Sequence, residues 1–169
     1  MSSGIAILGA GWAAAMHARA ARSAGVRVVG VASRDLAKTQ AFAQRHGASL
    51  ATTDWKSLCG ERAVDLVVVA TPNALHHAQA MYALARGKAV LVEKPMALSV
   101  ADGEDMIRAA SSAGVTLAVG HMWRYRLEVV ALRDRIAAAE RAIEILRDER
   151  RRGQQKHERP RRRASKSNR

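Results

Sequence analysis

The chain has 169 residues, 49% of them hydrophobic, which is enough for one domain with a core of its own. It has one cysteine, Cys59, which excludes an intrachain disulfide and a cysteine metal cluster and fits a reducing, cytoplasmic compartment. The net charge is +13, but residues 147–169 carry +8 of it (eleven Lys or Arg, three acids), so the excess does not indicate a nucleic-acid-binding fold.

The N-terminal segment, residues 1–20, is apolar but has no basic residue before its apolar part. This disfavours a secretory signal peptide. The sequence also lacks any run of about 18 uninterrupted apolar residues, which predicts that no segment spans a membrane.

Residues 1–126 alternate between short β-branched runs and longer Ala-rich segments. We expect strands at residues 4–8, 26–32, 64–70, 88–92 and 115–119, with a weaker strand at 48–52. We expect helices at residues 12–24, 35–46, 74–86 and 99–113. This alternation is typical of βαβ units, and the continuously apolar strands indicate helices on both faces. The sequence therefore predicts a doubly wound, Rossmann-like α/β domain with a parallel sheet.

The expected helix ends carry suitable capping residues. Glycines stand at the expected C-terminal ends, at Gly25, Gly47, Gly87 and Gly114. Residues with N-cap preference stand at Asp54, Thr71 and Ser99. These positions support the predicted element boundaries.

After residue 126 the pattern changes to one amphipathic helix at residues 127–150. Its apolar stripe consists of Val129, Leu132, Ile136, Ala139, Ile143 and Leu146. The stripe covers barely three heptads, so a coiled coil is compatible with it but not established. Residues 151–169 are basic and nearly devoid of apolar side chains, and we expect a disordered tail.

The first motif with chemical meaning is a glycine turn, residues 7–14, which reads ILGAGWAA. Gly9, Gly11 and Ala14 match the pattern G-x-G-x-x-A, between the first strand and the first helix of a βαβ unit. In that setting Gly9 permits a tight turn, Gly11 lets a pyrophosphate approach the backbone, and Ala14 allows close packing. The alternative is a glycine turn with no ligand.

The second motif, at the end of the second strand, reads ASRD, residues 32–35. Dinucleotide folds often place an acid here for the ribose 2′-hydroxyl. Ser33 and Arg34 suit a 2′-phosphate instead, which favours NADP over NAD. Asp35 fits a helix N-cap better. The alternative is that Arg34 stacks on the adenine or lies in solvent.

The third motif follows the most hydrophobic strand and includes Thr71, Pro72, Asn73, His76 and His77. Thr71 is expected to cap the next helix, while Asn73 and His76 are expected to face the cleft at the carboxyl edge of the sheet. For His76, a structural hydrogen bond is an equal alternative to a cofactor contact. His77 is expected on the surface.

The fourth motif is Glu93-Lys94-Pro95, at the end of the strand at residues 88–92. Pro95 keeps Lys94 extended, so the strand end presents an amine beside the expected nicotinamide. A partly desolvated lysine there could hydrogen-bond a substrate hydroxyl and join in proton transfer. The alternative is an ordinary charged turn.

Together, over residues 3–138, these motifs resemble the Gfo/Idh/MocA oxidoreductases. The resemblance implies hydride transfer between NADP (favoured) or NAD and a sugar or polyol, with Lys94 as a catalytic residue. Near residue 127, where the family usually has a proline, this chain has Leu127. No metal site is predicted. The motifs and the resemblance give these cofactor-binding candidates: Gly9, Gly11, Trp12, Ala13, Ser33, Arg34, Thr71, Asn73, His76, Glu93, Lys94, Trp123 and Arg124.

The family continues into a second α+β domain that supplies most of the substrate pocket, and no pattern for it follows here. We therefore expect weak or no turnover by this chain alone. The alternative hypothesis is that the chain is a non-catalytic binding or interaction protein. In that case residues 127–150 would pair with a copy or another subunit, while the basic tail would bind nucleic acid weakly and without specificity.

Overall fold

The structure, a computed structural model, describes residues 3–158. The chain divides into two compact units, Met1–His121 and Met122–Arg169. The first unit ends five residues before the expected boundary at residue 126, because the chain leaves the sheet soon after its last strand ends at Val119.

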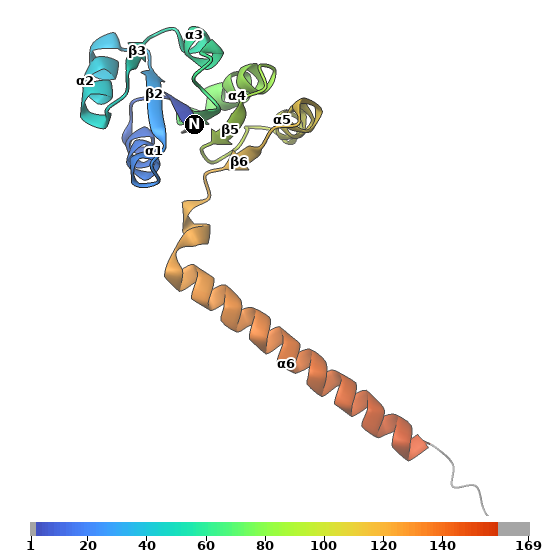
Figure 1. Cartoon of the computed structure of the whole chain (residues 1–169). Helices are drawn as coiled ribbons and strands as arrows, with labels where there is room; N and C mark the ends of the chain where they lie inside the picture. Colours follow the sequence, from blue (N-terminus) through green and yellow to red (C-terminus); the bar gives the residue numbers. More distant parts are fainter. Residues whose placement is uncertain (1–2, 159–169) are drawn as a thin grey trace, which may run out of the picture. The chain divides into compact units, whose positions relative to one another are not determined.

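The first unit contains one six-stranded sheet in which every pairing is parallel (Figure 1). The spatial order of the strands is β3-β2-β1-β4-β5-β6. Their bounds are β1 Gly4–Leu8, β2 Arg27–Ala32, β3 Leu50–Thr52, β4 Leu66–Val69, β5 Ala89–Val92 and β6 Leu117–Val119. All six expected strands are present, and the predicted doubly wound class is confirmed.

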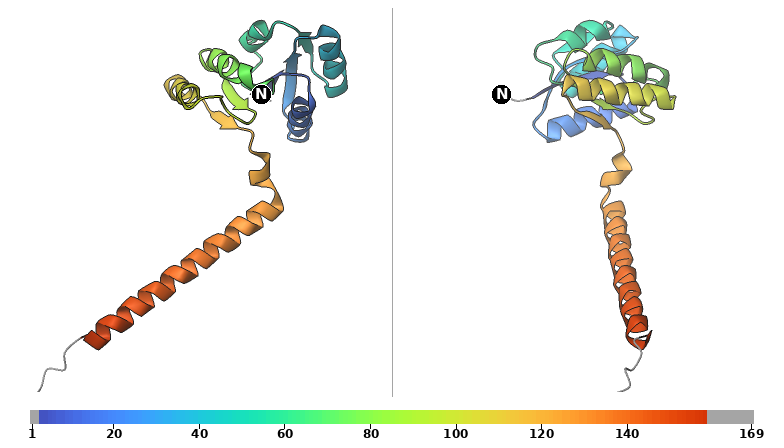
Figure 2. Two further views of the ribbon diagram at one scale, coloured as in Figure 1. Left: turned by 180° about the vertical axis from the view of Figure 1, so that it is seen from behind. Right: turned by 90° about the vertical axis from the view of Figure 1, so that its right-hand side faces the viewer.

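Five α-helices connect these strands and cover both faces of the sheet (Figure 2). They are α1 Trp12–Ser23, α2 Leu36–His46, α3 Trp55–Gly60, α4 His76–Leu84 and α5 Val100–Ala113, with a 3₁₀ turn, η1 Asn73–Leu75, before α4. Sequence reasoning missed α3, because six residues are too few to show a helical period.

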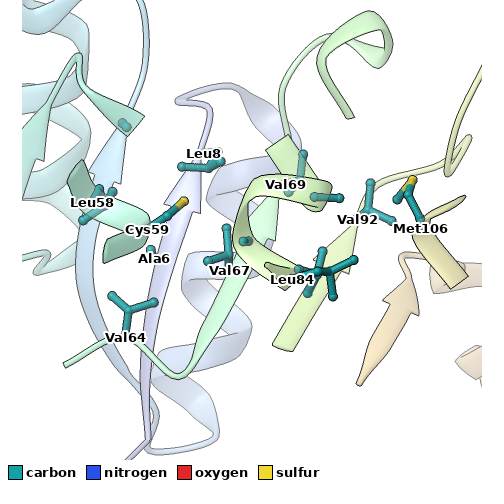
Figure 3. Close-up of a cluster of buried hydrophobic side chains, with 14 of the residues drawn as sticks. Ala6, Leu8, Leu58, Cys59, Val64, Val67, Val69, Leu84, Val92 and Met106 are labelled. Carbon is teal, nitrogen blue, oxygen red and sulfur yellow. The ribbon is translucent and has the colours of Figure 1, made fainter. Parts of the chain in front are cut away.

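The core consists of two apolar layers separated by the sheet. Successive side chains of β1 point to opposite faces of the sheet. Ile5 and Ile7 pack with α1 and α2, whereas Ala6 and Leu8 pack on the other face. The second layer, drawn in Figure 3, brings Leu84 from α4 and Met106 from α5 together with Val67 and Val69 of β4 and Val92 of β5. Because both faces are covered, every residue of β1 is buried.

Most of the expected helix ends are confirmed. The four glycines expected at C-terminal ends adopt positive φ, at Gly25, Gly47, Gly87 and Gly114. The side chains of Asp35, Asp54 and Ser99 accept hydrogen bonds from backbone N–H groups in the first turns of α2, α3 and α5. The expected cap at Thr71 is wrong, because Pro72 precedes η1 and the Thr71 hydroxyl donates to Gln79 instead.

The second unit contains a 3₁₀ turn, η2 Met122–Tyr125, and one long helix, α6 Leu127–Glu158. The helix continues eight residues past the expected end at residue 150, so the expectation of disorder is wrong for residues 151–158. Six of these eight residues are good helix formers (two Arg, two Gln, one Lys and one Glu), and Pro160 lies beyond the stretch in the sequence. The rest of the expected tail, residues 159–169, lies outside the described residues.

None of the helices in residues 3–158 combines the length and apolar character that a bilayer crossing requires.

Truncating a buried side chain tests the packed layer under α4. Leu84 is fully buried, so Leu84→Ala should lower the free energy of unfolding by about 2–5 kcal/mol, through lost burial and the cavity left behind. Ile107→Ala, on the exposed face of α5, should cost well under half of that. Urea denaturation followed by circular dichroism measures both variants, and equal losses would contradict the described layer.

Candidate functional site

The main cleft of the first unit lies at the carboxyl ends of β1, β2 and β4. β1 and β4 are neighbours in the sheet, and the connections from them run in opposite directions, to β2 and to β5. Open α/β sheets bind ligands at such a switch point. The cleft measures about 540 Å³, within the usual range of roughly 300–1,000 Å³ for ligand pockets.

The glycine turn after β1 is possible only because Gly9 has no side chain. Its φ is +111°, and a Cβ built there would lie 2.3 Å from the carbonyl oxygen of Ala70. Its N–H donates to the carbonyl of Ala32 at 2.8 Å. Gly9 therefore brings the ends of β1, β2 and β4 together under the cleft.

Gly11, unlike Gly9, is not crowded by neighbouring atoms. A Cβ built on Gly11 would meet nothing within 4 Å, so the backbone here faces open space. Gly11 is also the N-cap of α1, and no side chain caps that helix start. Trp12 and Ala13 follow and line the cleft. An uncapped helix start beside open backbone fits a phosphate group.

The segment after β2 and the first turn of α2 contribute two cations. Arg34 and Lys38 are exposed and both line the cleft. Ser33 also lines it, but its hydroxyl already contacts Thr39 Oγ1 at 2.5 Å and the Asp35 carbonyl at 3.2 Å. Sequence reasoning missed Lys38, although it lies in the first turn of α2, directly after the Asp35 cap and four residues after Arg34.

An aromatic side chain that was also missed lines the same part of the cleft. Trp55, at the start of α3, is partly buried and packs edge-on against Tyr82 with ring centroids 5.0 Å apart. The expected N-cap at Asp54 marked the start of α3, but a six-residue helix shows no apolar period that would have pointed to Trp55. The cleft therefore has an indole wall in addition to Arg34 and Lys38.

The end of β4 contributes Thr71 and Pro72 to the lining. The Thr71 hydroxyl donates to Gln79 Oε1 at 2.6 Å, which fixes Thr71 against α4. Asn73 begins η1 and is exposed, but it does not line the cleft.

His76 does not face the cleft as expected; it is fully buried. Its Nδ1 lies 2.9 Å from the carbonyl oxygen of Pro95, and its Nε2 lies 2.9 Å from that of Thr71. Of the two alternatives, the structural hydrogen bond is therefore the one observed. The ring ties the segment after β5 to the segment after β4.

His77 is half-buried rather than on the surface. Its ring nitrogens each lie 4.0 Å from a carboxylate oxygen of α5, one of Asp102 and one of Asp105. The three side chains could hold a metal ion. At 4.0 Å these two contacts are longer than hydrogen bonds, and the Asp105 carboxylate pairs more closely with Arg108.

The Glu93 carboxylate, at the end of β5, is buried. Glu93 Oε1 lies 2.8 Å from Nε2 of His17 on α1, and its other oxygen accepts from the Lys94 N–H at 3.2 Å. Glu93 and His76 thus hold Lys94 and Pro95 from two sides, against α1 and against α4. The Lys94 side chain itself is exposed.

The last two candidates lie in the second unit. Trp123 and Arg124 belong to η2, and Trp123 is 68% exposed. The guanidinium of Arg126 lies 4.7 Å from the Trp123 ring centroid. These contacts are internal to the second unit, and the cofactor role expected of Trp123 and Arg124 stays a prediction.

Comparison with known proteins bears on the first unit. Residues 3–121 match the Gfo/Idh/MocA profile, described as an oxidoreductase family with an NAD-binding Rossmann fold. The chain is 38% identical over 118 residues to 1,5-anhydro-D-fructose reductase of Ensifer adhaerens, which is 70% of this chain and 35% of that protein.

Two similar solved structures contain a nicotinamide dinucleotide. GenD2 from gentamicin A biosynthesis, in complex with NAD, is 34% identical with a TM-score of 0.74, covering 77% of this chain and 37% of that one. Biliverdin reductase from Synechocystis sp. PCC 6803, in complex with biliverdin and NADP⁺, is 32% identical with a TM-score of 0.71. The match covers 79% of this chain and 42% of that one. The chain thus spans about a third to two-fifths of these relatives.

The buried pair at the end of β5 can be tested by a double-mutant cycle. His17→Ala should lower the free energy of unfolding by about 1–3 kcal/mol, because it leaves the Glu93 carboxylate buried without that partner. Glu93→Gln should cost much less in the His17→Ala background than in the wild type. Urea denaturation of the four proteins measures the coupling, and additive losses would contradict the pair.

Proposed function

Because the chain belongs to the Gfo/Idh/MocA oxidoreductase family, we propose that its cleft binds NADP(H) in preference to NAD(H), as part of hydride transfer to or from a sugar or polyol. The observation that carries the proposal is the cationic pair Arg34 and Lys38 beside an uncapped glycine turn. A nicotinamide dinucleotide is already the ligand of the two solved relatives.

The pyrophosphate is proposed to bind at the start of α1. The open backbone at Gly11 leaves room for phosphate oxygens, and the uncapped N–H groups of the first turn can donate to them. The positive end of the helix dipole adds favourable electrostatics at the same place. Trp12 and Ala13 would lie beside the phosphates.

The adenosine half is proposed to bind at the end of β2. A carboxylate that accepts from both ribose hydroxyls is the usual mark of NAD binding. Here the nearest acid, Asp35, accepts from the Lys38 N–H as the cap of α2. Arg34 and Lys38 instead offer positive charge to a 2′-phosphate, and the Trp55 ring offers an apolar wall to the adenine.

Lys94 is proposed to be the catalytic residue. A bound nicotinamide supplies the hydride donor or acceptor, and a group beside it must handle the proton of the reacting hydroxyl. Lys94 has an exposed ammonium on a backbone held by the Glu93–His17 and Pro95–His76 contacts. Preorganisation of that backbone would keep the amine in place without a conformational search.

The substrate class rests on the family resemblance and on one relative. The Ensifer adhaerens protein is named as a reductase of a sugar derivative. The Synechocystis structure contains biliverdin, so a similar cofactor-binding domain occurs there together with a ligand that is not a sugar. Sugar or polyol is therefore proposed for this chain as the class that the combination of motifs favours.

The choice between NADP and NAD can be measured by fluorescence titration. Arg34→Ala and Lys38→Ala should each weaken NADPH binding by about tenfold or more, the usual size of one charge-assisted contact, and change NADH binding by less than about threefold. Arg45→Ala is the matched control, because Arg45 is exposed on α2 but does not line the cleft. Equal loss for NADPH and NADH would remove the proposed preference.

The position of Lys94 can be tested without a known substrate. Lys94→Met should leave the NADPH dissociation constant within about threefold, because the phosphates bind elsewhere, yet should shift the emission of bound NADPH by removing a charge near the nicotinamide. Lys88→Met is the control, because the Lys88 ammonium donates to the backbone carbonyls of Glu61 and Val64, outside the cleft. An unchanged emission spectrum for Lys94→Met would place the amine away from the nicotinamide.

A further inference from the structure

The apolar stripe of α6 follows a strict heptad. Numbering the heptad from Val129 puts Val129, Ile136 and Ile143 at a positions and Leu132, Ala139 and Leu146 at d positions. The five larger side chains of this stripe are 38–63% exposed. Burying such a seam against another helix is the main driving force of coiled coils.

We propose that α6 pairs with α6 of a second copy of this chain as a parallel, in-register, two-stranded coiled coil over residues 128–147. The a positions are all β-branched, and two of the three d positions are leucine. β-branched residues at a with leucine at d favour two parallel strands over higher oligomers. The small Ala139 weakens the centre of the seam but does not interrupt it.

The charges that flank the seam complement each other in this arrangement. In a parallel pair, each g position faces the e position five residues later on the other helix. Glu128 then faces Arg133 of the second copy, and Arg135 faces Glu140 of the second copy. The symmetry repeats both contacts, so four attractive pairs border the seam.

The antiparallel arrangement of the same six seam residues is less favourable. It places Glu128 against Glu149 of the second copy, a repulsive contact that the symmetry repeats. The attractive contact between Arg133 and Glu140 also occurs twice, so two repulsive pairs offset two attractive ones, whereas the parallel arrangement has four attractive pairs. Electrostatics therefore selects the parallel orientation.

The local ion pairs on α6 do not oppose this pairing. Arg126 and Glu128 lie 3.3 Å apart, and Arg133 and Asp134 lie 3.0 Å apart. All four side chains are more than half exposed, and exposed pairs of this kind contribute little to stability. Glu128 and Arg133 can therefore re-pair across the seam at little cost.

The mass of the full chain in solution tests the pairing. By sedimentation equilibrium, the wild type should show twice the chain mass, and Ile136→Lys should weaken self-association by at least tenfold. Ile145→Lys is the matched control, because Ile145 is 60% exposed on the same helix but off the stripe, and it should associate like the wild type. A monomeric wild type, or equal loss in both variants, would overturn the proposal.

Cysteine cross-linking tests the orientation. Val129→Cys alone should form an interchain disulfide under mild oxidation, since parallel pairing puts the two residues side by side. Val129→Cys mixed with Leu146→Cys should give no disulfide between the two variants; a mixed disulfide would overturn the parallel arrangement. The native Cys59 should not interfere, because it is buried and burial raises the pKa of its thiol to about 11.

The pairing is independent of the proposed cofactor function, because the stripe lies in the second unit. NADPH titration of Ile136→Lys separates the two. A monomeric variant that binds NADPH with wild-type affinity is the expected result. Loss of NADPH binding in a folded, monomeric Ile136→Lys protein would contradict the independence of the two units.

Discussion

The close approach of three strand ends at Gly9 is the constraint on which the rest of the cleft depends. Its N–H bonds to Ala32, and its missing side chain leaves room for the carbonyl of Ala70. Any larger residue would push β4 away from β1, at the switch point of the sheet. The start of α1 and the ends of β2 and β4 can then line one pocket.

A second constraint acts one strand further along, at the end of β5. Two histidines from different helices hold this strand end: the partly buried His17 contacts the Glu93 carboxylate, and the fully buried His76 contacts the Pro95 carbonyl. The exposed Lys94 lies between them in sequence. Polar contacts that would be costly to leave unpaired thus fix the backbone of the one residue proposed to act on substrate.

Most of the fold could be predicted from the sequence, because apolar runs, glycines and caps agree on the same βαβ units. The short α3 was missed, and with it Trp55. Of the site, the glycine turn and Arg34 were predictable from local spacing, whereas Lys38 was overlooked. The burial of His76 could not be predicted, because both of its partners are backbone carbonyls from segments whose approach depends on the folded sheet.

The central claim is that the cleft binds NADP by both its pyrophosphate and its 2′-phosphate, and ³¹P NMR of NADP⁺ during titration with the chain tests it most directly. The two kinds of phosphate give separate signals. The account predicts that both signals shift or broaden at the same protein concentration, and that only the 2′-phosphate signal recovers with Arg34→Ala. A pyrophosphate response without any response of the 2′-phosphate would contradict the proposed role of Arg34 and Lys38.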